Sequence, residues 1–384
     1  MMEDGGREGE LILSGKFVYG RAFEDREGYI VIKDGTIKET GAEAGVEGTI
    51  KGFIIPSFIN AHTHIGDSVA KEPDFMPLAE LVGPGGFKER ILAETPYEVL
   101  LNAMKDTIND IFGCGIQLFG DFREGGLSGI NVLKSAFEAS GAKLRLRIFG
   151  RPGPGDDADA EVDTILGAAD GIGMSSTADW SWNVLKDLAD AARSSGKVFA
   201  LHAGERNSDD IEDAIELEPD FIVHLTKASR KHFQRMYDRD IGAVVCLRSN
   251  MVTGMGVPPI REMLDSGLIV GVGTDNVMLN SPDMFHEMEF ISKLLRLDER
   301  EILKMCTWNS ARILKEDKIG LIEEGMRANL VVIRADTPNM SGVRNWLRGV
   351  VRRATRADIG AILYEGKPFK PFYHASRRKP SGRG

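Results

Sequence analysis

Four short segments of this chain carry residue types that bind transition metals. They are His62-Thr63-His64, His202 with Glu205 three residues later, His224, and Asp275. Neutral imidazoles together with a carboxylate suit Zn²⁺, and Fe²⁺ is the close alternative. Such a metal lowers the pKa of its bound water toward about 7, so hydroxide forms at neutral pH and can attack an electrophilic carbon. These residues therefore predict metal-dependent hydrolysis.

Each segment stands at the end of a short apolar run, at 54–59, 198–201, 221–223 and 269–272. Side chains alternate along a strand, so His62 and His64 would point to the same face. Active sites of α/β barrels lie at the carboxyl ends of parallel strands, where side chains from separate strands meet. The pattern predicts an α/β fold, a (β/α)8 TIM-type barrel with the metal site at its mouth.

The spacing of apolar runs supports eight barrel strands. We expect them at 54–59, 116–122, 144–149, 171–175, 198–201, 221–224, 243–247 and 269–273. Successive runs lie about 30 residues apart, which is the size of a β-α-β unit. The stretch 96–112 has a proline at its start and apolar residues at spacings of three and four, so we expect a helix there.

Both ends of the chain contain short β-type runs, at 11–38 near the start and at 330–333 and 359–364 near the end. Asp34-Gly35 is a strong hairpin signal between two of them. We therefore expect a small β-sandwich domain built from 1–53 plus 321–373, the barrel over 54–320, and a flexible basic tail at 374–384.

Composition excludes several classes of protein. The net charge is −10, so no basic face for nucleic acid is predicted, and 42% hydrophobic with 28% charged residues is ordinary for a globular enzyme. No apolar stretch approaches the length of a membrane span, and the acidic start does not resemble a signal peptide. Three separate cysteines form no C-x-x-C pair and indicate free thiols. The expected location is the cytoplasm, and the expected partner is a small-molecule substrate.

Each candidate residue also has a purely structural interpretation. His202 and His224 could be core histidines, and Asp275 could cap the start of a helix. Their joint occurrence at four strand ends favours the metal site over coincidence. His232, His286 and His374 lie on expected helices or the tail, and no role is assigned to them.

At this point the sequence resembles the amidohydrolase superfamily. The stretch 56–64, Pro-Ser-Phe-Ile-Asn-Ala-His-Thr-His, is similar to its entry motif. The region from Cys246 through Ser249-Asn250 to Gly273-Thr274-Asp275 is similar to the branch that contains cytosine, guanine and S-adenosylhomocysteine deaminases.

The resemblance implies a role for each matching residue. His62, His64, His202 and Asp275 would bind one catalytic metal, and Asp275 would also accept the proton of the attacking water. His224 would hold that water or the substrate, and Glu205 would shuttle protons to a ring nitrogen and to the leaving amine. Two-metal relatives use a carboxylated lysine on the fourth strand, but 170–176 contains no lysine. A single metal is therefore expected.

The predicted reaction is hydrolytic deamination of an amino-substituted heterocycle: a purine, pyrimidine, pterin or nucleoside-like compound. The alternatives are hydrolysis of a cyclic amide or hydrolytic dechlorination at the same site. A catalytically inactive barrel that only binds a partner is a third class, which retention of every ligand argues against. Barrels that resemble this one often pair, so a homodimer is the assembly considered.

The sequence departs from the deaminase pattern C-P-x-S-N at Cys246-Leu247-Arg248-Ser249-Asn250. One hypothesis is that Arg248 contacts an anionic group of the substrate, with Asn250 also at the substrate. The alternative is that Arg248 pairs with a neighbouring acid. Arg145, Arg147 and Arg151 raise the same two options, and the glycine-rich stretch 83–86 suggests a lid.

Overall fold

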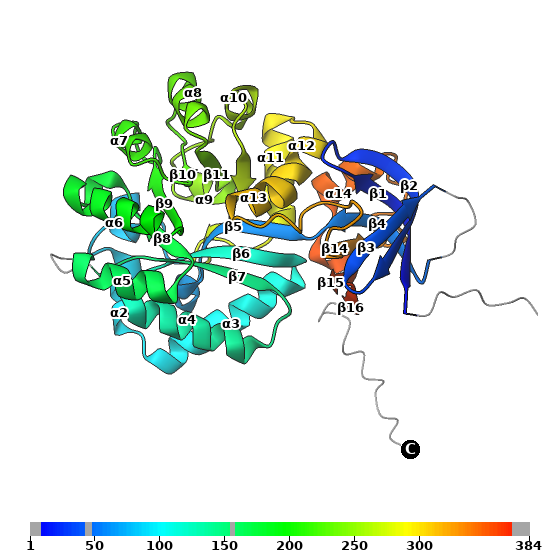
Figure 1. The fold of residues 1–384 in the computed structure, drawn as a ribbon, viewed down its shortest axis with the longest axis horizontal. Helices are drawn as coiled ribbons and strands as arrows, with labels where there is room; N and C mark the ends of the chain where they lie inside the picture. The colour runs from blue at the N-terminus through cyan, green and yellow to red at the C-terminus, as the bar shows by residue number, and fades with distance from the viewer. Residues whose placement is uncertain (1–8, 43–47, 154–157, 371–384) are drawn as a thin grey trace, which may run out of the picture.

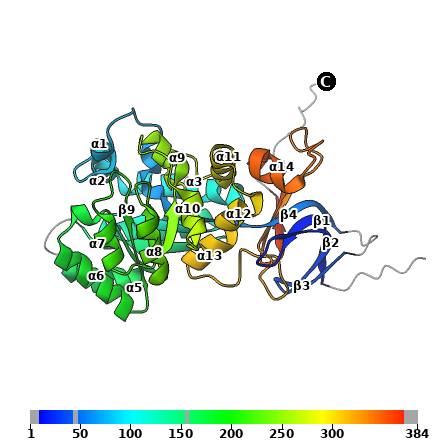
Figure 2. The same cartoon turned by 90° about the horizontal axis from the view of Figure 1, so that it is seen from above.

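The structure is a computed structural model that describes residues 9–42, 48–153 and 158–370 (Figure 1). The predicted tail at 374–384 lies outside the described residues. A parallel sheet surrounded by helices forms the larger part of the molecule, and a second sheet lies beside it, as both views show (Figures 1 and 2).

The larger sheet has nine strands, and every neighbouring pair in it is parallel. In chain order the strands are β5 (Phe58–His64), β6 (Ile116–Arg123), β7 (Arg145–Gly150), β8 (Gly171–Met174), β9 (Val198–Ala203), β10 (Phe221–His224), β11 (Gly242–Val245), β12 (Val270–Val272) and β13 (Asp275–Asn276). The last two are consecutive pieces of one segment. Since β12 pairs with β11 and β13 pairs with β5, the chain of pairings returns to its start, as a barrel requires.

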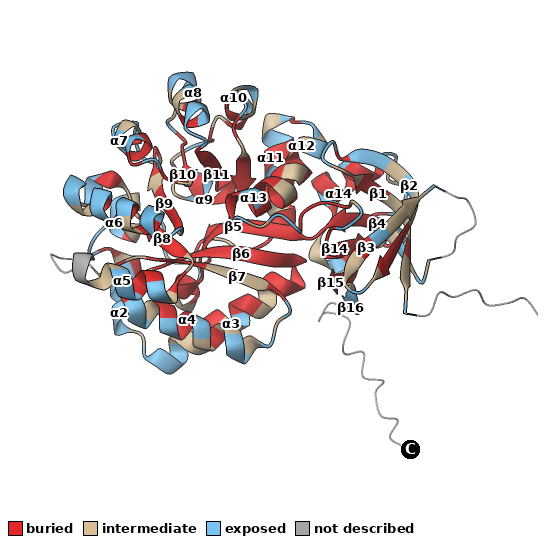
Figure 3. Ribbon diagram, viewed as in Figure 1, coloured by how far each residue is buried: buried red, intermediate tan, exposed pale blue. Residues whose placement is uncertain are grey.

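Helices lie outside these strands, with their exposed faces turned to solvent (Figure 3). They include α3 (Tyr97–Gly113), α4 (Gly126–Ser140), α5 (Ala158–Ala168), α6 (Trp182–Ser194), α7 (Ile211–Glu216), α8 (Arg230–Asp238), α10 (Ile260–Asp265), α11 (Met284–Leu295) and α12 (Glu299–Lys304). In α6, the Ser181 side chain caps the first turn and Leu185, Leu188 and Ala192 form the buried stripe. The helix predicted at 96–112 is confirmed as α3, with Pro96 as its N-cap.

The barrel interior is filled by alternate strand residues. Ile59, Leu118, Phe149, Phe221 and Val244 are buried there in one apolar cluster. This packed core leaves the carboxyl ends of the strands as the place for polar side chains.

The second sheet joins both ends of the chain in the order β16-β15-β14-β4-β1-β2-β3. Its strands are β1 (Leu11–Tyr19), β2 (Glu24–Lys33), β3 (Thr36–Gly41), β4 (Ile50–Pro56), β14 (Leu330–Ile333), β15 (Ile359–Tyr364) and β16 (Lys367–Phe369). Hydrogen bonding makes them one sheet where two packed sheets were expected, and α14 (Trp346–Arg353) packs on it through Trp346 and Phe53. The predicted turn at Asp34-Gly35 is confirmed, because both residues have positive φ between β2 and β3.

The first predicted barrel strand, 54–59, has the wrong boundaries. Its first half belongs to β4, which pairs with β14 of the smaller sheet, and the barrel strand begins only at Phe58. Ser57 stands between them and donates its backbone N–H to the carbonyl oxygen of Asn329. The stretch 54–59, which is apolar apart from Ser57, therefore crosses from one sheet to the other.

The segment after β5 folds over the mouth of the barrel as a 3₁₀ turn (Ile65–Ala70), α1 (Leu78–Val82) and α2 (Phe87–Glu94). Leu81 of this segment packs against Met278 and Leu279, which follow Asp275. Among the described residues, no helix is both long and apolar enough to cross a membrane. The three cysteines are buried and free, as predicted.

Candidate metal centre

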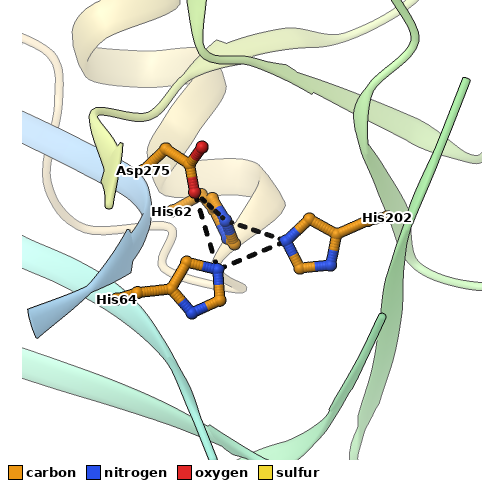
Figure 4. A group of neighbouring side chains, drawn as sticks. All are labelled: His62, His64, His202 and Asp275. Atoms are coloured by element: carbon orange, nitrogen blue, oxygen red, sulfur yellow. Dashed lines mark hydrogen bonds and ion pairs between the residues drawn. The ribbon is translucent and has the colours of Figure 1, made fainter. Parts of the chain in front are cut away.

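Four side chains from three strands converge at the mouth of the barrel (Figure 4). His62 and His64 come from the end of β5, His202 from β9 and Asp275 from β13, and one ligand atom of each lies within 4.8 Å of all the others. Asp275 Oδ1 lies 3.2 Å from His62 Nε2 and 3.5 Å from His64 Nε2. These are the four residues that the sequence predicted as one ligand set.

Hydrogen bonds on the far side of two rings fix their orientation. His64 Nδ1 lies 3.1 Å from the Phe122 carbonyl oxygen, and His202 Nδ1 lies 2.7 Å from the Met174 carbonyl oxygen. A carbonyl only accepts, so each Nδ1 carries the proton and each Nε2 presents a lone pair inward. Ser249 Oγ donates to Asp275 Oδ2 at 2.5 Å, which leaves Oδ1 facing the histidines.

These ligands fit a divalent cation. The Nε2 atoms of His64 and His202 lie only 3.4 Å apart, although neither carries a proton. Burial lowers the pKa of His64 to about 3, and burial with neighbouring imidazoles lowers the pKa of His202 well below its usual value. Burial opposes charge on Asp275 too, but its hydrogen bond with His62 and the other histidines hold the pKa of Asp275 well below the ordinary value. Neutral nitrogen lone pairs and a carboxylate thus face one point, which only a cation stabilises.

His62 is held differently from the other ligands. Its Nδ1 is buried and has no hydrogen-bond partner among the described residues. The ring lies edge-on to Phe122 at 4.5 Å between centroids, and Gly273 packs so close that a Cβ there would lie 2.7 Å from the His62 Cβ. Packing in the barrel core therefore orients this ligand.

The alternative interpretation of Asp275 as a helix cap does not match its position. It lies on β13 and pairs with Thr63 of β5, while Asp283 caps the following helix. Its φ of 62° is left-handed, which is uncommon for an aspartate and marks strain at a functional position.

A second acid lies beside the four ligands. Glu205 Oε2 is 3.5 Å from His224 Nε2, and Asn250 Nδ2 reaches both Glu205 Oε1 at 3.4 Å and His224 Nδ1 at 3.1 Å. Because the amide donates to Nδ1, the proton of a neutral His224 is on Nε2, where it can be donated toward a ligand. His224 has a φ of 76°, another strained position in the same site.

Burial raises the pKa of Glu205, and Asp275 raises it further against the effect of His224. A raised pKa makes this carboxyl easier to protonate than an ordinary glutamate, which favours a proton donor in general acid–base catalysis. If His202 and His224 were only structural histidines of the core, Glu205 would have no function beside them.

Arg248 pairs with a neighbouring acid, as the alternative to a substrate contact predicted. Its Nε donates to Glu287 Oε1 at 2.7 Å and its Nη2 donates to the Ser281 carbonyl oxygen at 2.7 Å. Arg145 and Arg147, at the start of β7, likewise pair with Glu316. A contact of Arg248 with substrate stays a prediction that these hydrogen bonds do not support.

Three functional neighbours were not identified from the sequence. Asp121 Oδ2 accepts from the backbone N–H of Ile65 at 2.6 Å and from Thr63 Oγ1 at 3.0 Å, so it fixes the chain around His64. Glu124 Oε1 lies 2.8 Å from His64 Nδ1, and Lys88 lies against Glu124. Asp121 and Glu124 could have been identified from the sequence, because both are acids at the end of the apolar run 116–122.

A cavity of about 590 Å³ lies on the outer side of His64, next to Glu124, and the four metal-facing residues, Glu205 and His224 are not among the residues that line it. Its apolar wall includes Leu92, Leu100, Met104 and Trp180, and its polar residues include Glu124, which contacts His64. Arg151 also lines it. This volume is within the range of small-molecule sites.

Comparison with known proteins agrees with this geometry. The model of the amidohydrolase family matches residues 53–353. An uncharacterized protein of Methanocaldococcus jannaschii is 35% identical over 371 residues, which cover 91% of this chain and 96% of that protein. A 5-methylthioadenosine/S-adenosylhomocysteine deaminase of Pelotomaculum thermopropionicum is 26% identical over 393 residues, covering 89% and 88% of the two chains.

Among solved structures, the zinc complex of an atrazine chlorohydrolase from Arthrobacter aurescens has the same fold, with a TM-score of 0.79 at 19% identity over 93% of this chain and 94% of that one. The family model covers most of the barrel and all four metal-facing residues. The chain therefore belongs to the amidohydrolase family.

Proposed function

We propose that this protein is a zinc-dependent hydrolytic deaminase that releases ammonia from an amino-substituted heterocycle. The observation that carries the proposal is the position of Glu205, a carboxyl with a raised pKa whose side chain is 18% exposed and lies beside His224 at the metal centre. Relatives named as deaminases and the structural likeness to a zinc hydrolase support it.

The chain's own residues divide the work as follows. His62, His64, His202 and Asp275 would hold one metal, which when bound supplies the Lewis acidity that makes water a nucleophile at neutral pH. Asp275 is an ionised acceptor that can take a proton from the attacking water. The donor at His224 Nε2 can orient the water or the developing oxyanion.

Glu205 would complete the reaction on the ring. Protonated, it would donate to the ring nitrogen next to the carbon under attack, so that a new C–O bond forms without leaving negative charge on the ring. Asp275 would pass the proton taken from water to the exocyclic nitrogen, and the Glu205 carboxylate would take the remaining proton of the new hydroxyl group, so that C=O forms as the C–N bond breaks and ammonia leaves. Such an acid–base group contributes typically ~10²–10⁴-fold to the rate.

Buried free thiols fit a reducing compartment, so we place the enzyme in the cytoplasm.

The test is ammonia release by the zinc-loaded protein with a panel of amino-purines, amino-pyrimidines, pterins and their nucleosides. We expect one class to react and Glu205→Gln to abolish the reaction with zinc content unchanged. Glu138→Gln, the same change at an exposed position of α4, is the matched control. Equal zinc loss in Glu205→Gln would show that Glu205 is a ligand and not a proton carrier.

Hydrolytic dechlorination is the second candidate, because the fold is shared with an atrazine chlorohydrolase. Cyclic amide hydrolysis would also use the same ligands. Chloride release from chlorinated heterocycles, or ring opening without ammonia, would favour these reactions over deamination.

A further inference from the structure

Helix α2 sends one charged side chain into the protein. Lys88 is only 6% exposed, although the rest of α2 is largely on the surface. A buried ammonium is costly unless it is paired. Its Nζ lies 2.6 Å from Glu124 Oε1 and 3.1 Å from Asn276 Oδ1, so two partners on different strand ends satisfy it.

Both partners of Lys88 are direct neighbours of metal ligands. Glu124 Oε1, the atom that faces Lys88, also lies 2.8 Å from His64 Nδ1. Asn276 follows Asp275 in the chain and pairs with His64 across β13 and β5. Lys88 thus joins the two strand ends where the ring of strands closes.

Glu124 is itself fixed from the other side. Arg123 Nη2 lies 2.6 Å from Glu124 Oε2, so each carboxylate oxygen has a separate cationic partner. The Arg123 guanidinium in turn fills the space over Gly66, where a Cβ would lie 2.1 Å from Nη1. With Oε2 held by Arg123, the direction of Oε1 toward His64 depends on Lys88.

Apolar contacts dock the same segment independently of this charge. Leu81 is buried with Met278 and Leu279, and Phe87 packs against that cluster. Loss of the Lys88 ammonium would therefore leave α1 and α2 in place but would release Glu124 and Asn276.

We propose that Lys88 is a positioning residue of the metal centre: through Glu124 it orients His64, and through Asn276 it fixes the strand end that carries Asp275. The segment over the barrel mouth thereby becomes part of the ligand support. This inference needs only a divalent metal site, so it stands or falls separately from the deaminase proposal.

Metal binding itself is the test. Zinc affinity is measured by chelator competition on the full chain at one neutral pH, and the visible spectrum of the Co²⁺ form reports ligand geometry. We expect Lys88→Met to weaken zinc binding by roughly 10- to 100-fold, the usual effect of losing an outer-shell partner, and to alter the Co²⁺ spectrum. Lys88→Arg, which keeps the charge, should recover most of the affinity. Lys71→Met is the control, since Lys71 is exposed.

A pair of variants separates positioning from general damage. Glu124→Gln should weaken zinc binding as Lys88→Met does, and the double variant should be little worse than the more affected single one, because both changes remove the same support. Zinc affinity within threefold of the native value and an unchanged Co²⁺ spectrum for Lys88→Met would overturn the proposal. The proposal would also be overturned if the losses of zinc affinity in Lys88→Met and Glu124→Gln added up fully in the double variant. If Lys88→Met does not fold, Glu124→Gln decides: zinc affinity within threefold of native and an unchanged Co²⁺ spectrum for that variant would overturn the proposal.

Discussion

The hydrogen bond from Ser249 to Asp275 offers a quantitative check on the metal centre. Ser249 is fully buried, and its hydroxyl donates at 2.5 Å to the carboxylate oxygen that does not face the histidines. Ser249→Ala removes this donor and leaves a buried charged oxygen with one partner fewer. A hydrogen bond to a charged group contributes roughly 1.5–3 kcal/mol net. At about 1.4 kcal/mol per factor of ten, zinc affinity should fall by roughly 10- to 150-fold.

Zinc dissociation constants from chelator competition measure this directly, with circular dichroism to show that the variant is folded. Ser194→Ala, at an exposed position at the end of α6, is the matched control and should bind zinc as the native protein does. An affinity of Ser249→Ala within threefold of native would refute the reasoning. It would mean that backbone position alone, and not this hydrogen bond, sets the orientation of Asp275.

Three further outcomes are expected. His202→Ala should reduce bound zinc to a small fraction of one per chain by elemental analysis, because one of four converging ligands is lost; retention of a full equivalent would contradict the ligand set. Burial raises the pKa of Asp121 from 3.8 to about 6, so its contribution to stability is present below pH 4 and is lost as pH rises through 6. In metal-free protein, Asp121→Asn should therefore gain about 3 kcal/mol relative to native between pH 4 and pH 7.5, measured by urea unfolding; a difference that does not change with pH would disprove it. Gly66→Ala should destabilise the protein by roughly 1–3 kcal/mol in the same assay, since its Cβ would overlap the Arg123 guanidinium, and native stability would show that Arg123 moves freely.

The strand ends could be predicted from the sequence because residue types that bind metals directly follow apolar runs there. His62, His202, His224 and Asp275 each follow an apolar run, and all lie at strand ends of one parallel sheet. The boundary at Ser57 was not predicted, because 54–59 is apolar apart from Ser57 and this single serine does not show that the two halves pair in different sheets. The domain limits at 53/54 and 320/321 stay predictions.

The residues that support the metal ligands could not be predicted from the sequence for a different physical reason. Lys88 looks like any helix lysine, since charged residues follow it at Glu89 and Arg90 and the helical pattern gives no sign that it is buried. Its partners lie 36 and 188 positions away, and only the closure of the barrel brings them within reach. Arg248 shows the converse: the sequence indicated a role for it at the substrate, but its guanidinium is directed to Glu287 on α11.

The metal centre depends on barrel closure as much as on its ligands. Asp275 reaches the histidines only because β13 pairs with β5, and His62 is oriented by core packing against Phe122 and Gly273 without a hydrogen bond at Nδ1. His64, by contrast, is oriented by polar groups at the end of β6. A change in the apolar core and a change in the polar support would thus reach the same metal by separate routes. This explains why one strand can carry two ligands that need different kinds of support, and why the site cannot form before the last barrel strand has paired with the first.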